Sequence, residues 1–397
     1  MLRILIASDK FKGSATSQAI AQALARGLSS TRAGIATAAV ADGGDGSLEV
    51  CESLGFRRVH HEVEGPDGAP VRAAFAVDDA GGRAFIEVAQ ACGLALLDPS
   101  ALGSPGYDAA RASSFGLGQL IWAALDQGAV RVIVGLGGSA TSDAGVGAAR
   151  ALGARFLDAD GLELEVPQAG MERISRVDLS GLDPRIAATE FVLAADVTNP
   201  LNGPEGAVRV YGPQKGLRQE QLEAHDALLR HCSELVESEL ADTGWAGAGH
   251  GLRTGAIAGR PGAGAAGGLG FFGMAILRAG YRSGVDLLME MGDLRHQMAR
   301  ADVVITGEGR IDSQTMTGKA AAGVARMARE LGKPVVAVCG RNDLEEHQVR
   351  QLGFERVFAM TEVEPDVSRC ITEPFPILER IGAGIGQYLL ERQDRLT

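Results

Sequence analysis

Residues 301–328 read ADVVITGEGRIDSQTMTGKAAAGVARMA. This stretch opens with the apolar run Val303–Ile305, which predicts a buried parallel strand. It closes with an alanine-rich segment that predicts a helix with Thr317 as its cap. The polar loop between them would bring free backbone N–H groups and the positive end of a helix dipole to one place, which suits a phosphate or a carboxylate. An ordinary solvated loop is the alternative for any single connection of this kind.

The composition is that of a globular protein that binds small molecules. A chain of 397 residues predicts two domains, and 46% hydrophobic with 22% charged residues is ordinary for a soluble protein. The net charge of −12 argues against nucleic acid as the main partner. Charges come too early for a signal peptide, and no apolar run reaches the roughly 18 residues of a membrane span. Five scattered cysteines without CxxC spacing favour a cytoplasmic protein with reduced thiols.

Strands and helices are predicted to alternate at both ends of the chain. Neither end supplies enough strands for a sheet of its own, but together they supply about five. We therefore predict one discontinuous flavodoxin-like α/β domain from residues 1–63 and 284–397. The middle, residues 64–283, reads as an inserted mixed α/β domain that includes an antiparallel hairpin around residues 71–89. The predicted strands of the first domain are residues 2–7, 35–41, 302–306, 334–338 and 356–359.

Five polar, glycine-containing loops follow predicted strands or border helices, at residues 9–17, 42–47, 135–147, 196–206 and 307–319. The carboxyl ends of strands in open α/β sheets converge on one crevice, so the loops beginning at Asp9, Asp42 and Glu308 should meet there. The loops at residues 135–147 and 196–206, which belong to the inserted domain, would face these three loops if the site lies between the domains. Cradling N–H groups, cations and carboxylates are what phosphoryl transfer needs. A hydrolase triad is poorly supported, because among these segments and the glycine-rich run only the latter contains a histidine, His250.

The lysines are few and unevenly placed. The chain has 38 basic residues, and only five of them are lysine. Four of the five, Lys10, Lys12, Lys215 and Lys319, lie in glycine-rich polar loops. The compact ammonium charge suits phosphate oxygens, which makes these four candidates for phosphate contacts. A solvated surface position is the alternative for each.

Seven motifs taken in order are more specific than any one loop. They are SDKFKGSATS, VADGGDGS, GLGGSATSDAGVG, AADVTNPLNGPEGA, YGPQKG, GAGAAGGLG and VVITGEGRIDSQTMTGKAAAGVA. In this order they resemble the bacterial glycerate kinase family over essentially the whole chain. The resemblance implies ATP-dependent phosphorylation of D-glycerate with Mg²⁺, giving 2-phosphoglycerate rather than 3-phosphoglycerate. It also implies an active site in the cleft between the domains and a restriction-endonuclease-like type for the inserted domain. A cytoplasmic enzyme, monomeric or homodimeric, is expected.

Residue roles are predicted from side-chain chemistry. Catalytic roles are predicted for Lys12, Asp42, Asp45, Asp196 and Lys319. Contacts with substrate or nucleotide are predicted for Ser14, Gly137, Gly138, Ser139, Thr141, Ser142, Asp143, Asn199, Lys215, Glu308, Arg310 and Thr315. Ligands of Mg²⁺ are predicted to be Asp42, Asp45, Glu308 and Asp312.

Several alternatives stay open at this point. Asp42 and Asp45 would hold the metal or accept the substrate proton, unless they only form an Asx turn. Backbone and hydroxyl groups of residues 137–142 make the best candidate for an anion nest. The residues do not divide nucleotide contacts from glycerate contacts. A kinase of a related hydroxy acid or polyol, and a non-catalytic nucleotide or sugar-acid sensor, are the competing functions.

Overall fold

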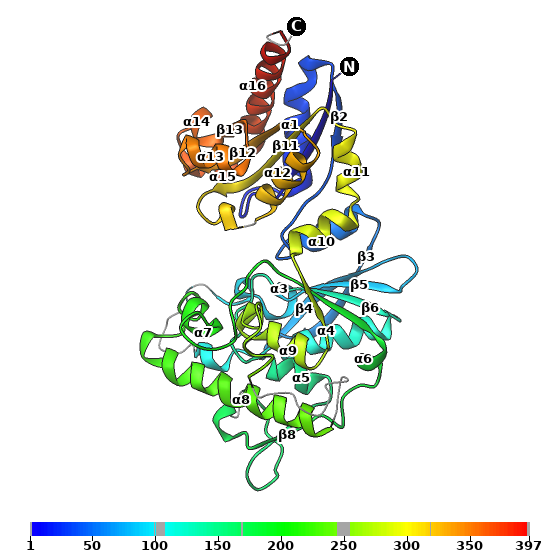
Figure 1. Cartoon of the computed structure of the whole chain (residues 1–397), viewed down its shortest axis with the longest axis vertical. Coiled ribbons are helices and arrows are strands. Elements are labelled where there is room, and N and C mark those ends of the chain that lie inside the picture. Colours follow the sequence, from blue (N-terminus) through cyan, green and yellow to red (C-terminus); the bar gives the residue numbers. More distant parts are fainter. Residues whose placement is uncertain are drawn as a thin grey trace. The chain divides into compact units, whose positions relative to one another are not determined.

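The computed structural model describes residues 2–98, 100, 108–167, 170–243, 255–317 and 319–394. The chain divides into two compact units, which are shown in Figure 1. Unit 1 comprises Met1–Asp42 and Val285–Thr397, and unit 2 comprises Gly43–Gly284. Within the described ranges no helix is both long and apolar enough to cross a membrane.

Unit 1 is built around a five-stranded sheet that joins the two ends of the chain. Its strands are β1 (Arg3–Ser8), β2 (Gly34–Thr37), β11 (Val303–Ile311), β12 (Val335–Asn342) and β13 (Arg356–Ala359). Its helices are α1 (Ser17–Gly27), η1 (Leu28–Thr31), α10 (Gly284–Met291), α11 (Leu294–Ala299), η9 (Thr315–Thr317), α12 (Ala320–Glu330), α13 (Glu346–Leu352), α14 (Met360–Val363), α15 (Val367–Thr372) and α16 (Pro374–Asp394).

The strand order of this sheet is β13-β12-β11-β1-β2, and every neighbouring pair is parallel. Numbered along the chain this is the order 2-1-3-4-5, which is the flavodoxin-like arrangement. The predicted fold class is thus confirmed. The strand order reverses between β1 and β11, whose register runs from Ile4 opposite Val303 to Ser8 opposite Gly307. In such sheets ligands bind at this switch point, beyond the carboxyl ends of the strands.

Helices cover both faces of the unit 1 sheet, because successive side chains of a strand point to opposite faces. Ile4 and Ile6 of β1 pack in one apolar cluster with α1 and α16, which lie side by side in Figure 1. Leu5 and Ala7 belong to a second cluster with α10, α11 and α12. The near-continuous apolar runs of the strands follow from this double burial.

Several predicted boundaries in unit 1 differ from the structure. β11 continues to Ile311 and β12 to Asn342, because the two strands keep pairing beyond the apolar runs. Glu308 therefore lies on a strand and not in a loop. The predicted cap at Thr317 is wrong, since α12 begins at Ala320 with Lys319 at the N-cap position.

Unit 2 contains a six-stranded mixed sheet and a small two-stranded one. Its strands are β3 (Arg57–Glu64), β4 (Pro70–Val77), β5 (Arg83–Glu87), β6 (Arg131–Gly135), β7 (Arg155–Leu157), β8 (Arg176–Asp178), β9 (Glu190–Ala194) and β10 (Gly280–Arg282). Its α-helices are α2 (Ser47–Ser53), α3 (Ala89–Cys92), α4 (Phe115–Asp126), α5 (Val146–Ala151), α6 (Arg185–Ala188), α7 (Ala207–Tyr211), α8 (Leu222–Thr243) and α9 (Leu269–Ala275). Its short 3-10 helices are η2 (Leu94–Leu96), η3 (Ala109–Arg111), η4 (Met171–Arg173), η5 (Pro213–Lys215), η6 (Gln219–Gln221) and η8 (Ala265–Gly267).

The mixed sheet has the order β10-β9-β6-β5-β4-β3. Strands β5, β6, β9 and β10 are parallel, so the loops that follow them leave the same edge. The predicted hairpin is confirmed, since β4 and β5 pair antiparallel. β3 pairs with β4 along its whole length, so the first boundary between units lies after Asp42 and not after residue 63. The mostly exposed, charged sequence of β3 gave no apolar signal for a strand.

Glycine-rich backbone packs closely inside unit 2. A Cβ atom on Gly267 would lie 1.9 Å from the carbonyl oxygen of Thr141, in the loop after β6. One on Gly264 would lie 2.2 Å from the carbonyl oxygen of Pro200, in the loop after β9. The backbone of the GAGAAGGLG motif therefore packs directly against the loops after β6 and β9. Residues 244–254, also glycine-rich and containing His250, lie outside the described residues.

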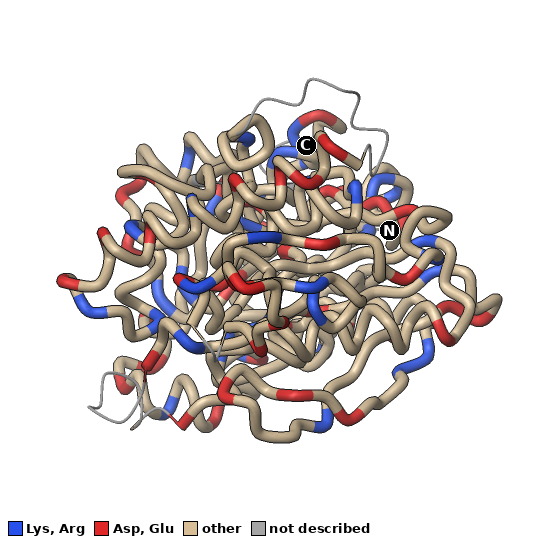
Figure 2. The backbone as a smooth tube through the Cα atoms, turned by 90° about the horizontal axis from the view of Figure 1, so that it is seen from below, with Lys and Arg blue, Asp and Glu red and all other residues tan. Residues whose placement is uncertain are grey.

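Charged residues of both signs are interspersed along the backbone, as Figure 2 shows. Acidic residues outnumber basic ones by 50 to 38 over the whole sequence. The functional residues must therefore be found from their positions on the two sheets.

Candidate active site

The carboxyl edge of the unit 1 sheet is organised around Asp9, which follows β1. The N–H of Asp9 donates to the carbonyl oxygen of Gly307 on β11 over 2.9 Å, across the switch point. Its Oδ1 accepts from the N–H of Lys10 over 2.7 Å. Burial, together with the negative charges of Asp42 and Glu308, raises the pKa of Asp9 to about 8 against the opposing effect of Lys10. The three acidic side chains expected to meet at this edge are therefore within electrostatic range of one another.

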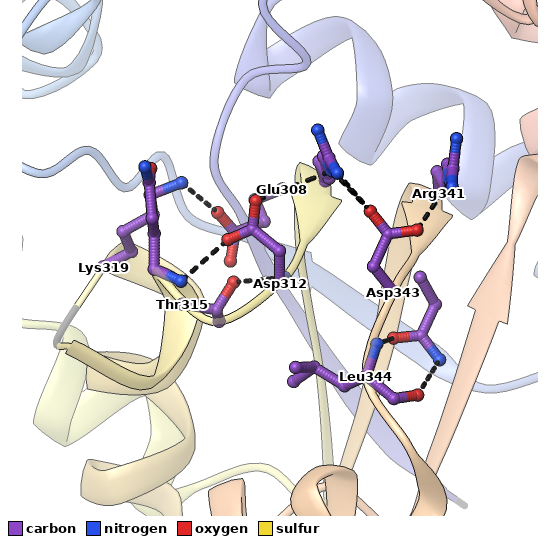
Figure 3. Close-up of polar contacts among 10 residues, drawn as sticks. Glu308, Asp312, Thr315, Lys319, Arg341, Asp343 and Leu344 are labelled. Atoms are coloured by element: carbon purple, nitrogen blue, oxygen red, sulfur yellow. Dashed lines mark hydrogen bonds and ion pairs between the residues drawn. The ribbon is translucent and has the colours of Figure 1, made fainter.

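Glu308 contributes a buried carboxyl group to this edge. Its Oε1 is buried and has no hydrogen-bond partner among the described residues, and its Oε2 lies 3.5 Å from Nζ of Lys319 (Figure 3). Burial raises the pKa of Glu308, while Thr315 and Lys319 act to lower it. A buried carboxylate oxygen without a donor is costly, and a bound cation would compensate it.

The remaining residues of the motif fix the turn between β11 and α12. Oδ1 of Asp312 accepts from the N–H of Gln314 over 2.8 Å, and Oγ1 of Thr315 accepts from the N–H of Asp312 over 3.1 Å (Figure 3). These are the local side-chain to backbone bonds of an Asx turn. They give Asp312 and Thr315 a local structural role, besides the ligand contacts predicted for them.

The loop after β1 reaches the same edge. Gly309 of β11 packs against the backbone of Phe11 and Lys12, with a Cβ at this glycine about 3.5 Å from each. The backbone of Lys12 thus lies against β11 at Gly309, the residue that follows Glu308. Oγ of Ser14 donates to the carbonyl oxygen of Ile371 over 2.9 Å, which ties this loop to α15. The hydroxyl group predicted to contact a ligand therefore already has a protein acceptor.

Two residues at this edge, Arg341 and Asp343, were missed by the sequence analysis. Arg341 of β12 lies opposite Arg310 of β11, and Asp343 contacts the guanidinium groups of both. A predicted strand that continued to Asn342 would have placed Arg341 opposite Arg310. The apolar run PVVAV gives no sign that strand pairing continues past it.

In unit 2 the loop after β6 holds most of the predicted anion nest. A Cβ on Gly137 would lie 2.5 Å from Cα of Gly44, so this loop packs on the glycine-rich loop that contains Asp45. Gly138 has φ of +75°, a backbone conformation that glycine adopts without strain. Asp45 itself is exposed.

Asp143 anchors this loop from inside. Its carboxylate is fully buried and accepts from the N–H and Oγ of Ser114, at 2.9 and 2.7 Å, and from the N–H groups of Gly145 and Gly147, at 3.1 and 3.2 Å. Four donors leave this carboxylate little capacity for a ligand. Asp143 therefore supports this loop from inside, and a direct ligand contact of its carboxylate stays a prediction.

Lys215 points into the same loop. Its side chain is buried, and Nζ donates to Oγ of Ser139 over 2.9 Å and to the carbonyl oxygen of Thr141 over 2.7 Å. Burial lowers the pKa of Lys215 to about 7, although the charge of Asp143 acts to raise it. Lys215, predicted to contact phosphates, therefore restrains at two points the loop that is the candidate for the anion nest.

Two hydroxyl groups of this loop are enclosed. Oγ1 of Thr141 and Oγ of Ser142 are buried and have no hydrogen-bond partner among the described residues. The carbonyl oxygen of Ser142 lies 2.6 Å from Nε2 of His225 on α8. Burial lowers the pKa of that histidine, which favours the neutral ring.

Asp196 and Asn199 follow β9 at the same edge of the unit 2 sheet. Nδ2 of Asn199 donates to the carbonyl oxygen of Glu205 over 2.8 Å, and its Oδ1 accepts from the hydroxyl of Tyr211 over 2.7 Å. Its amide therefore fixes the loop. Asp196 lies near Tyr281, whose pKa is raised by burial and by this negative charge.

The predicted metal ligands come from both units. Asp42, Glu308 and Asp312 belong to unit 1 and Asp45 to unit 2, and the described residues contain no group of three or more His, Cys, Asp or Glu side chains arranged to hold a metal ion. Protein sites for Mg²⁺ commonly use one or two carboxylates, with waters and substrate phosphates as the other ligands. Glu308, with its unpartnered buried Oε1, fits such a site.

A separate cavity of about 490 Å³ lies in unit 2 at the amino ends of β6 and β9, where those strands begin with Arg131 and Glu190. None of the predicted site residues lines it. Ligand chemistry in parallel sheets belongs to the opposite, carboxyl edge.

Comparison with known proteins agrees with the motifs and the two sheets. The sequence pattern of the glycerate kinase family matches residues 4–390. The chain belongs to the glycerate kinase family.

Curated relatives cover nearly all of the chain. It is 39% identical to the glycerate kinase of Bacillus subtilis (strain 168), over 90% of each chain. It is 38% identical to the glycerate 2-kinase of Escherichia coli (strain K12), again over 90% of each. The crystal structure of a putative glycerate kinase 2 from Salmonella typhimurium LT2 has a TM-score of 0.81 and 35% identity, and the likeness covers 99% of each chain. This chain therefore shares its fold with that structure over nearly its whole length.

Proposed function

We propose that this member of the glycerate kinase family transfers the γ-phosphoryl group of ATP to the 2-hydroxyl of D-glycerate, giving 2-phosphoglycerate. The observation that carries the position of transfer is the 38% identity, over 90% of each chain, to a relative named glycerate 2-kinase. Transfer breaks the bond between the γ-phosphorus and the bridging oxygen of ADP and forms one to the glycerate oxygen. The hydroxyl proton must pass to a base.

In unit 1, the carboxyl edge supplies charge for the phosphates. Lys12 and Lys319 are two of the ammonium groups proposed for this role, and Arg310 adds a guanidinium. Fixed cations at the transferring group stabilise charge that develops in the transition state, and this is the main catalytic device available for phosphoryl transfer. We assign these three residues to anionic oxygens of the substrates.

Mg²⁺ would be held here by Glu308, through its buried Oε1, with Asp42 as the neighbouring carboxylate. When bound with ATP, the ion neutralises phosphate charge and orients the transferring group. Asp9, whose pKa is raised to about 8, is poised to exchange a proton near neutral pH.

In unit 2, the residues that follow β6 and β9 supply a second polar surface. Gly137 and Gly138 offer backbone N–H groups, and the buried Lys215 and Asp143 keep their loop in place. Asp45 and Asp196 are the carboxylates of this unit proposed for proton transfer. The expectation that the substrates bind between the two units stays a prediction, as do cytoplasmic location and oligomeric state.

The test is a coupled assay with ATP, MgCl₂ and D-glycerate, followed by phosphorus NMR of the product. Coupling of phosphorus to the proton on C2 is expected, since the phosphate would sit on the 2-oxygen. A signal coupled to the C3 methylene protons would contradict the position of transfer. L-glycerate, glycolate, glycerol and tartronate in the same assay measure preference among small acids and polyols. ATP binding without turnover of any of them would favour the sensor.

A further inference from the structure

Strands β11 and β12 extend beyond their neighbours at the carboxyl edge of unit 1. The pairing of β11 with β1 ends at Gly307, and that of β12 with β13 ends at Cys339. β11 and β12 pair further, so Arg310 and Arg341 lie opposite each other on the extension. Like charges directly opposite on neighbouring strands destabilise a sheet. A nearby negative charge would offset the repulsion between these two guanidinium groups.

Asp343 supplies part of that charge. Its Oδ2 accepts from Nε of Arg310 over 2.6 Å and lies 2.5 Å from Nη2 of the same side chain, and its Oδ1 accepts from Nε of Arg341 over 2.6 Å (Figure 3). Its own N–H donates to the carbonyl oxygen of Ile311 over 2.9 Å, which fixes the residue to β11. Although partial desolvation acts to raise the pKa of Asp343, the hydrogen bonds from the two arginines lower it. The carboxylate is therefore charged at neutral pH.

One carboxylate does not balance two guanidinium groups. Asp312 approaches Arg310 only to 3.6 Å, and its Oδ1 is used in the turn. The arginine side chains remain 61% and 62% exposed, whereas that of Asp343 is 21% exposed. Asp343 contacts Arg341 only at Nε, and the two Nη atoms of Arg341 take no part in this interaction. The pair thus retains exposed N–H donors in the planar geometry that phosphates and carboxylates accept.

We propose that Arg310 and Arg341 together bind an oxyanion of the substrates, and that Asp343 is the positioning residue that orients both guanidinium groups. The proposal rests on the proposed function, which places phosphates and a carboxylate at this edge. Two sources share the required chemistry, the phosphate chain of the nucleotide and the carboxylate of the hydroxy acid. The experiment separates them.

The test uses the full chain with three single variants, Arg341→Gln, Asp343→Asn and Arg26→Gln. Arg26 is the matched control, an arginine of unit 1 that pairs with Glu379 over 2.6 Å and is 54% exposed, on α1. Steady-state kinetics give kcat and KM for ATP and for D-glycerate. Pyrophosphate titration, followed by the shift in melting temperature, measures binding of a phosphate anion without turnover.

For Arg341→Gln we expect a roughly 10-fold rise in KM, with a smaller change in kcat, for the substrate whose oxyanion the pair binds. A rise in KM for ATP, together with a smaller shift in melting temperature on adding pyrophosphate, identifies the phosphate chain as the bound group. A rise in KM for glycerate alone identifies the carboxylate. Asp343→Asn should raise the same KM about 3- to 10-fold, because the amide keeps the size but loses the charge. A fourth variant that combines Arg341→Gln with Asp343→Asn should raise this KM by less than the product of the two single effects, as expected for residues that act through each other.

The proposal is overturned if Arg341→Gln and Asp343→Asn match Arg26→Gln in both KM values and in the pyrophosphate response. The three residues would then be an ordinary surface ion-pair network. The proposed function fails separately, if the wild-type chain phosphorylates no glycerate. In that case an Arg341-dependent pyrophosphate shift still supports the anion site, and a shift equal in all variants rejects it.

Discussion

Nζ of Lys215 lies 2.9 Å from Oγ of Ser139 and 2.7 Å from the carbonyl oxygen of Thr141, all three within unit 2. These bonds run from η5 to the loop after β6, so the ammonium group restrains the loop at two points. We expect Lys215 to affect substrate binding through the loop that it restrains.

Lys215→Met should therefore disturb both the loop and activity. The thioether fills similar space but donates nothing, and it leaves the carbonyl oxygen of Thr141 without this partner, which typically costs about 1–3 kcal/mol. We expect a lower melting temperature and a loss of about 10-fold or more in kcat/KM. Lys333→Met is the control, because Nζ of Lys333 donates to the carbonyl oxygen of Ala301 over 2.7 Å, away from the loops. Equal losses of activity in the two variants would show that Lys215 has no special effect on the site.

Lys12→Ala and Lys319→Ala should each reduce kcat/KM about 10²- to 10³-fold, the usual effect of losing a fixed cation from a phosphoryl-transfer site. Lys319→Arg should recover only part of the rate, because the guanidinium plane does not occupy the ammonium position. Lys333→Ala should stay within about twofold in rate, with some loss of stability from its bond to Ala301. Steady-state kinetics of the four variants decide this, and similar mild effects throughout would move the phosphate site to arginines and backbone amides.

Stability should depend on pH through Asp9. Its pKa is about 8 in the folded chain against an ordinary value of 3.8, so between these limits the folded state holds a proton that the unfolded state has released. The free energy of unfolding should therefore fall as pH rises from about 4 to 8, by at most about 1.4 kcal/mol per pH unit from this group. Urea unfolding without Mg²⁺ or nucleotide measures it.

Asp9→Asn removes this titrating group, so the free energy of unfolding of the variant should change less with pH. The stability of the variant relative to the wild type should therefore increase as pH rises from about 4 to 8. Asp302→Asn makes a useful contrast. Hydrogen bonds from Arg3 lower the pKa of Asp302 to about 2, so its stabilising contribution is present above its ordinary pKa and lost below it. Identical curves for the wild type and Asp9→Asn would remove Asp9 as a proton-exchanging group.

The two ends of the chain should fold together. Deleting residues 285–397 removes β11, the partner of β1 in the sheet, and leaves β1 and β2 as a pair. Two strands alone are marginal in water, so we expect residues 1–42 to lose protection from hydrogen exchange. A fragment of residues 43–284 keeps its own apolar core and should remain folded. Protected amides in β1 of the 1–284 fragment would contradict a discontinuous domain.

The sequence by itself determined the parts of this protein that depend on local pattern. Short apolar runs bounded by glycine and polar residues predict strands such as Val303–Ile305, and the alternation of strands and helices predicts parallel sheets. The ordered motifs identified the family. Thr16 at the start of α1 and the hairpin of β4 with β5 are likewise local. Each follows from the short-range geometry of a few consecutive residues.

Tertiary structure alone decided which residues meet. Strand β3 belongs to unit 2 because it pairs with β4. Strand β11 extends to Ile311 because it pairs with β12 as far as that residue. Lys215 donates to Ser139, which lies 76 residues earlier in the chain, and Asp343 accepts from Arg310 on the neighbouring strand. Such contacts depend on strand order and register. These arise when the whole sheet buries its apolar faces, and no window of consecutive residues contains that information.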